Sequence, residues 1–161
     1  MAIPSILLAI ALITLTKASV PGVLVAITVP EIPRVVRLVR GIVLTLREQP
    51  YIEAATAIGT GVTKILVRHL LPNTLAPLVV QATYICAAAV LIEAGLGFLG
   101  AGTAPEIPSW GNIMAEGRTY FQVSPWMILF PGLFLATTVL AVNLVGDGLR
   151  DLLDPRIARR M

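Results

Sequence analysis

The sequence has 161 residues, of which 57% are hydrophobic and only 13% are charged, with a formal net charge of +3 at pH 7 and a mean hydropathy of +0.88. An average soluble domain has about 25% charged residues, so this chain has too little polar surface to cover a water-exposed globule. The composition therefore excludes a soluble enzyme, a disordered chain and, with a single cysteine, a disulfide scaffold. The basic residues lie beside apolar runs and form no single basic face, so no nucleic-acid partner is expected. The sequence predicts a membrane protein in contact with a lipid bilayer.

Four apolar stretches predict helices that cross the membrane. A hydrocarbon core about 30 Å thick needs roughly 20 helical residues. The first apolar run is too long for one straight span, and Lys17 and the Pro21-Gly22 pair in its middle predict a turn between two helices. The first of these helices is short, which suggests that the chain starts inside a helix. We expect one all-α transmembrane domain over residues 1–161, with spans at about 3–16, 22–36, 74–97 and 125–146.

The distribution of lysine and arginine predicts the orientation of these spans. Six basic residues lie between 33 and 72, one lies between 97 and 124, and four follow Gly146. Because cytoplasmic loops carry the excess of basic residues, the 33–72 loop and the tail are expected in the cytoplasm and the 97–124 loop outside. Four spans then place both ends in the cytoplasm. Three spans with the N-terminus outside are the alternative, since nothing charged precedes the first run.

Motifs that would indicate catalysis or a cofactor are incomplete. Gly95, Gly97 and Gly100 match G-x-G-x-x-G, but they close an apolar helix, whereas the dinucleotide fingerprint follows a strand and opens a helix. His69 is the only histidine, which excludes a two-histidine zinc site, and no serine has a plausible base beside it. We expect a non-catalytic chain with no metal and no cofactor of its own.

Glu93 is the one acidic residue in the span predicted at 74–97. An ionisable group at membrane depth is costly to bury and is by default a candidate for function. Glu93 lies about one turn from the outer end of its span, where it could also reach water or a partner. A structural hydrogen bond and a place near a translocation path are both consistent with this position.

The loop from 47 to 72 is too long and too patterned for a simple connector. An alanine-rich short helix is predicted after Pro50, then a turn at Gly59, then a helix with an apolar stripe from Val62. We expect a helix–turn–helix on the cytoplasmic surface that inserts as a small, stiff knob into a groove on another protein. An amphipathic hairpin lying on the membrane surface is the alternative.

The spacing of Glu53-Ala54-Ala55, Gly59 and Leu71-Pro72 resembles the EAA loop of binding-protein-dependent ABC importer permeases, the loop that docks on the ATP-binding subunit. His69, two residues before Leu71-Pro72, is typical of the dipeptide, oligopeptide and nickel permeases. Three further stretches are similar to that subgroup, at 93–100, 108–111 and 143–156. Members of the family usually have six spans, so the chain resembles the C-terminal part of a permease of the peptide permease C type.

This resemblance implies a partial type I ABC importer permease fold. It implies a permease subunit that translocates di- or oligopeptides, or a related small solute, across the cytoplasmic membrane of a bacterium or archaeon. The partners implied are two ATP-binding subunits, a second permease subunit and an extracytoplasmic solute-binding protein. ATP would be bound by those partner subunits, because this chain has no phosphate-binding loop. The residues expected at the ATPase interface are Glu53, Ala54, Ala55, Gly59, His69, Leu71 and Pro72.

Two other functions are the alternatives. A secondary transporter would need ion-coupling carboxylates near the middle of the membrane, and Glu93 alone is thin support. A secondary transporter would also not explain the alanine-rich cytoplasmic hairpin. A membrane scaffold without ATPase coupling is the other alternative. An intramembrane enzyme is excluded because the chain has no paired catalytic groups.

Overall fold

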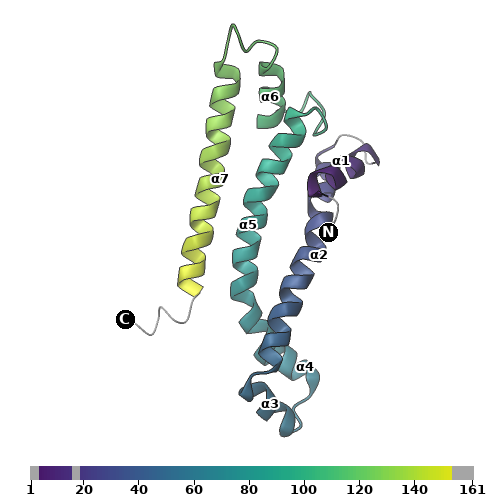
Figure 1. Ribbon diagram of the computed structural model, residues 1–161, viewed down its shortest axis with the longest axis vertical. Coiled ribbons are helices and arrows are strands. Elements are labelled where there is room, and N and C mark those ends of the chain that lie inside the picture. Colours follow the sequence, from purple (N-terminus) through teal and green to yellow (C-terminus); the bar gives the residue numbers. More distant parts are fainter. Residues whose placement is uncertain (1–3, 16–18, 154–161) are drawn as a thin grey trace. The chain divides into compact units, whose positions relative to one another are not determined.

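The computed structural model describes residues 4–15 and 19–153, and every regular element in these ranges is helical, as predicted. The described residues do not include Lys17, either end of the span predicted at 3–16, or the tail from 154 to 161. In chain order (Figure 1) the elements are α1 (Ser5–Leu15), α2 (Val20–Arg47), α3 (Pro50–Ala57), α4 (Val62–Ile65), the π-helix η1 (Leu66–Leu70), α5 (Leu71–Phe98), α6 (Trp110–Gly117) and α7 (Trp126–Leu153).

The chain divides into two compact units whose boundaries lie within α2, α5 and α7. The first unit contains the described residues up to Ile32 together with Tyr84–Leu144. The second contains Pro33–Thr83 and the described residues from Val145 onward.

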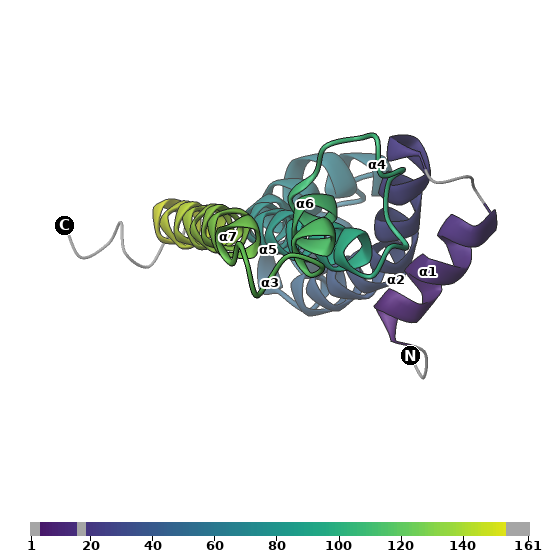
Figure 2. The same ribbon diagram turned by 90° about the horizontal axis from the view of Figure 1, so that it is seen from above.

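A core of small and branched side chains holds α1, the start of α2 and the end of α5 together in the first unit. Ala9 from α1, Ala26 from α2 and Leu96 from α5 are at most 1% exposed. Alanine at a helix contact lets the two backbones approach closely, which matters where lipid supplies no hydrophobic drive for association. Figure 2 shows α1 lying against the first part of α2.

Within residues 4–15 and 19–153, two helical stretches are long and apolar enough to cross a membrane, Val62–Phe98 and Trp126–Leu153. The first contains the predicted span at 74–97, and the second contains the span predicted at 125–146 except for Pro125. By contrast, α1 has 11 residues, fewer than the roughly 20 that a crossing needs. The 28-residue α2 carries Arg34, Arg37 and Arg40 in its second half. The spans at 3–16 and 22–36 therefore stay predictions.

The two helices predicted in the first apolar run are separate, since α1 ends at Leu15 and α2 begins at Val20. Only the placement of Pro21-Gly22 in the turn between them is wrong, because both residues lie in the first turn of α2. Ser19 precedes the helix, and its side-chain oxygen accepts a hydrogen bond of 3.3 Å from the Gly22 N–H. Proline is well tolerated in a first helical turn, where its missing N–H would have had no partner. The helix thus starts two residues before the predicted position.

The break expected between the loop that ends at 72 and the span that starts at 74 is also absent. Helical structure runs without interruption from Val62 to Phe98, so the second arm of the hairpin continues directly into α5. The last helix is longer than predicted as well, since α7 continues to Leu153.

Candidate functional site

The segment 47–72 forms the predicted hairpin from α3, a turn, α4 and η1 (Figure 1). Gln49 has extended backbone angles and Pro50 opens α3, which ends the preceding helix and starts the next without losing a backbone hydrogen bond. Glu53 lies in the first turn of α3 and is exposed. Its carboxylate interacts favourably there with the positive end of the helix dipole.

The turn of the hairpin is a Schellman motif centred on Gly59. The Thr60 N–H donates to the Ala55 carbonyl at 3.0 Å, and the Gly59 N–H donates to the Thr56 carbonyl at 2.9 Å. Gly59 has a φ of 79°, which glycine adopts freely and other L-residues adopt at a cost of about 1–2 kcal/mol. Nothing lies within 4 Å of a Cβ built on Gly59. The backbone conformation alone therefore requires glycine here, as the sequence predicted.

Three apolar side chains are buried in the hairpin: Ile52 at 4%, Ala55 at 8% and Leu70 at 7% exposure. Ala55 packs inside the chain, whereas Ala54 is exposed. The placement of both alanines at the ATPase interface stays a prediction. Adjacent positions on a helix point about 100° apart, so two neighbouring alanines cannot both face a partner squarely.

The tip of the hairpin presents apolar side chains that the sequence analysis did not select. Ile58 and Val62 flank the Gly59 turn, and each is 83% exposed. In the apolar stripe that begins at Val62, Val62 and Leu66 are exposed, Ile65 is half-buried and Leu70 is buried. Large apolar residues on both sides of a glycine turn are the sequence signal that could have identified this tip.

His69 connects the two arms of the hairpin to the start of α5. Its ring lies 6.2 Å from the ring of Tyr51 in α3, centroid to centroid, at an interplanar angle of 51°. Its carbonyl accepts a hydrogen bond of 2.6 Å from the side-chain amide of Asn73. Leu71 and Pro72 follow at the start of α5 and are exposed. Tyr51 and Asn73 were not predicted as site residues.

Glu93 lies apart from the hairpin in the chain, in the part of α5 that belongs to the first unit. It is half-buried. Its role stays a prediction. Among the described residues, no group of three or more His, Cys, Asp or Glu side chains is placed to hold a metal ion.

A second ordered cluster follows α5, in the segment 97–112, and depends on three glycines. A Cβ on Gly111 would lie 2.5 Å from the Ala94 carbonyl oxygen, and a Cβ on Gly102 would lie 2.8 Å from the backbone of Gly97. Real Cβ atoms essentially never approach so closely. The glycines permit the loop and α6 to pack directly on the backbone of α5.

Asn112 holds this loop in place with its side-chain amide. The amide nitrogen Nδ2 donates to the carbonyls of Thr103, Ala104 and Ile107, at 3.4, 3.2 and 2.9 Å, and lies 3.2 Å from the Thr103 hydroxyl. The Asn112 N–H also donates to the hydroxyl of Ser109, which caps α6. Ser109 and Gly111 belong to the sequence stretch at 108–111 and Gly97 to the stretch at 93–100, and none of the three was predicted as a site residue.

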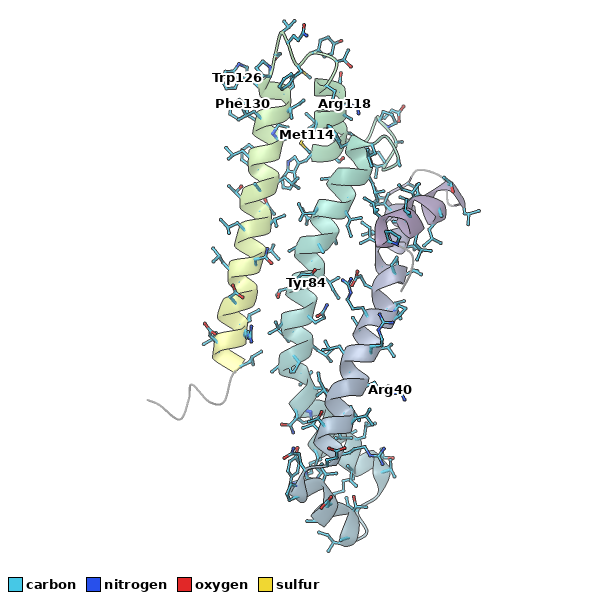
Figure 3. The ribbon with its side chains drawn as sticks, viewed as in Figure 1. Arg40, Tyr84, Met114, Arg118, Trp126 and Phe130 are labelled. Carbon is cyan, nitrogen blue, oxygen red and sulfur yellow. The ribbon has the colours of Figure 1, made fainter. Side chains whose placement is uncertain are left out.

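Side chains of α6 and the following turn contact both neighbouring helices in the first unit. The guanidinium carbon of Arg118 lies 5.0 Å from the centre of the Phe98 ring. The labelled Met114 lies between α6 and α7 in Figure 3, while Trp126 and Phe130 extend together from the same side of α7. Their ring centres are 6.0 Å apart, and both are exposed, as expected for aromatic residues at a membrane interface.

Comparison with known proteins identifies the family. The model of the family described as binding-protein-dependent transport system inner membrane component matches residues 1–159. The chain belongs to this family. The partial type I permease fold predicted from the sequence is consistent with this membership, and the relatives are inner-membrane transport permeases rather than members of an enzyme family.

Relatives in the family have names that indicate peptide transport. A probable peptide ABC transporter permease protein of Sinorhizobium fredii is 53% identical over 160 residues, which cover 99% of this chain and 55% of the relative. A dipeptide transport system permease protein of Alkalihalophilus pseudofirmus is 45% identical over 98% of this chain and 52% of the relative. A glutathione transport system permease protein of Escherichia coli is 43% identical over 97% of this chain and 52% of the relative. The chain thus spans about half the length of these relatives.

Proposed function

We propose that this chain is the C-terminal part of a permease subunit of an ATP-binding cassette importer that carries di- or oligopeptides across the cytoplasmic membrane. The observation that carries this proposal is the hairpin at 47–72, which has a buried interior, a glycine-dependent turn and an exposed apolar tip. The family membership and the names of the relatives support the importer assignment.

The proposed role of the hairpin is to bind an ATP-binding partner subunit. Ile58 and Val62 would enter a groove on that partner, and the exposed Glu53 would face a basic residue beside it. Apolar side chains at the centre of a contact with charges at its rim are typical of protein interfaces. ATP would bind the partner, and the permease chain would contribute movement without catalysing hydrolysis. The other partners proposed are a second permease subunit and a binding protein on the 97–124 side.

Deletion and complementation test the transport function. In cells that lack the gene, uptake of a radiolabelled dipeptide should fall to background and should return with the complete permease that carries this segment. The restored uptake should require the binding protein and should be insensitive to ionophores that collapse the proton gradient. Uptake that collapses with the gradient but not with removal of the ATPase would indicate a secondary transporter and contradict the proposal.

Cysteine labelling tests the proposed orientation. Arg47 and Val123 are both exposed in the structure, and each is replaced by cysteine in a complete permease that lacks Cys86. In intact spheroplasts an impermeant maleimide should label the cysteine at 123 and not the one at 47, whereas a permeant maleimide should label both. Labelling at 47 by the impermeant reagent would overturn the cytoplasmic placement of the hairpin.

A further inference from the structure

The helix that joins the hairpin to α5 changes its hydrogen-bond pattern over one turn. In α4 the Leu66 N–H donates to the Val62 carbonyl, four residues back. At the end of η1 the Leu71 N–H donates to the Leu66 carbonyl, five residues back. The η1 segment is therefore a single π turn, equivalent to one extra residue inserted into an α-helix. Such turns are rare and occur mostly as isolated bulges within α-helices.

The residues that follow the π turn favour it over an α turn. Pro72 has no N–H, and in an α-helix its ring would clash with the carbonyl four residues back, which belongs to Arg68. Proline alone is not sufficient, because Pro77 lies inside α5 where the helix is regular. The second contribution comes from Asn73, whose side-chain amide donates to the His69 carbonyl at 2.6 Å. The residue after Pro77 is Leu78, which has no donor in its side chain.

The π turn is also connected to the first arm of the hairpin. His69 lies within η1, and its ring contacts the ring of Tyr51 in α3. The same residue therefore binds α5 through its carbonyl and α3 through its ring. If the helix rotated at the π turn, α3 would move with it, because α3 is held by this ring contact as well as by the covalent connection through α4.

One residue in an α-helix corresponds to a rotation of about 100° and a rise of about 1.5 Å. If η1 became α-helical without loss of a residue, the hairpin would turn by about that amount relative to α5, and its exposed tip would face a different direction. We propose that Pro72 and Asn73 are positioning residues, which hold the π turn and thereby set the angle at which the hairpin meets its ATP-binding partner. This inference rests on the proposed function of the hairpin.

Two variants in the complete, reconstituted importer test the inference. The first, Pro72→Ala with Asn73→Leu, removes both features that favour the π turn. The second adds deletion of Val67, which is 57% exposed, so that the helix becomes α-helical with the hairpin back in its original direction. Pro77→Ala is the matched control. The quantities measured are the amount of assembled complex and the number of dipeptides imported per ATP hydrolysed.

The double variant should lower the transport ratio by about tenfold, the added deletion should restore most of it, and the control should leave it unchanged. If Pro72 and Asn73 only stabilised the helix, deletion of Val67 would not be expected to restore the transport ratio. A double variant with the wild-type ratio, or a loss that the deletion fails to restore, would overturn the inference.

A structural measurement separates this inference from the proposed function. Spin labels at Ile58 on the hairpin tip and at Leu75 on α5 report the direction of the hairpin in the complete permease without a partner. The distance between the labels should change in the double variant and return to the wild-type value when Val67 is deleted. An unchanged distance overturns the inference. A changed distance with no transport by the wild-type complex would instead contradict the proposed function.

Discussion

The turns at Gly59 and Gly100 have the same hydrogen bonds but different surroundings. Each ends a helix in a Schellman motif with a glycine at positive φ, 79° and 75°. After Gly59 the chain returns with exposed apolar residues on both sides of the turn. After Gly100 it packs on the backbone of α5 through Gly102 and Gly111. The turn of the hairpin is thus determined by local conformation and leaves an exposed apolar tip, whereas the loop after Gly100 is determined by contacts within the chain.

The largest effect is expected at the packed loop, from Gly111→Val. The first side-chain atom would meet the carbonyl oxygen and the Cα of Ala94, at 2.5 and 3.0 Å. Backbone atoms cannot move aside as side chains do. The free energy of unfolding should therefore fall by about 3 kcal/mol or more, the upper end of the range for overpacking. The thermal midpoint of the complete permease in detergent measures it.

Gly95→Ala is the matched control for this substitution. Gly95 is also a helical glycine, yet nothing lies within 4 Å of its Cβ position. Alanine there should leave the midpoint unchanged or raise it slightly, because alanine is favoured over glycine in a helix by about 1 kcal/mol. Equal effects of the two substitutions would contradict the close packing described for Gly111.

A pair of tryptophan substitutions distinguishes the inside of the hairpin from its outside. Ala55→Trp should disrupt the hairpin, since Ala55 is 8% exposed and overpacking costs about 1–3 kcal/mol. Trypsin should then cleave at Arg47 and Lys64 faster than in the wild-type permease. Ala54→Trp should leave cleavage unchanged and weaken binding of the ATP-binding subunit in pull-down. The opposite assignment of the two effects would show that Ala55 faces the partner after all.

A small effect is expected from Arg118→Ala, because an exposed cation–π contact is worth about 0.5–1 kcal/mol. Phe98→Leu removes the same contact from the other side. The double variant should then be less destabilised than the sum of the two single variants, in thermal midpoints measured on the complete permease. Fully additive losses would mean that the 5.0 Å contact contributes nothing to holding the loop.

The sequence predicted the hairpin turn better than the packed loop, because the turn depends on neighbouring residues and the loop depends on contacts between separate segments. The break at Pro50 and the turn at Gly59 depend on a few consecutive residues, and both were predicted. The requirement for glycine at 102 and 111 appears only when separate segments of the chain approach each other, so the G-x-G-x-x-G pattern indicated only a helix end. Composition also does not distinguish the buried Ala55 from the exposed Ala54.

The start of α5 shows a further limit. Proline can open a helix or lie within one, and the sequence placed Pro72 at the end of the loop, just before the span predicted at 74–97. No residue pattern in the sequence marks a π turn. The unbroken helical stretch from Val62 to Phe98 was therefore not predicted. The same ambiguity affected Pro21, where a proline read as part of a turn lies in the first turn of α2.

The central claim is that the hairpin couples ATP hydrolysis to import, and the most direct test is the transport ratio of a Gly59→Val importer. Valine at a φ of 79° is strained whatever space surrounds it, because a β-branched side chain disfavours that conformation. Gly61→Ala is the control, since Gly61 has a φ of −62° and open space around its Cβ position. In proteoliposomes with the binding protein and ATP-binding subunits, the valine variant should insert normally and lose both dipeptide import and binding-protein-stimulated ATP hydrolysis, while the control retains both. Import at the wild-type rate by the Gly59→Val importer would contradict the claim.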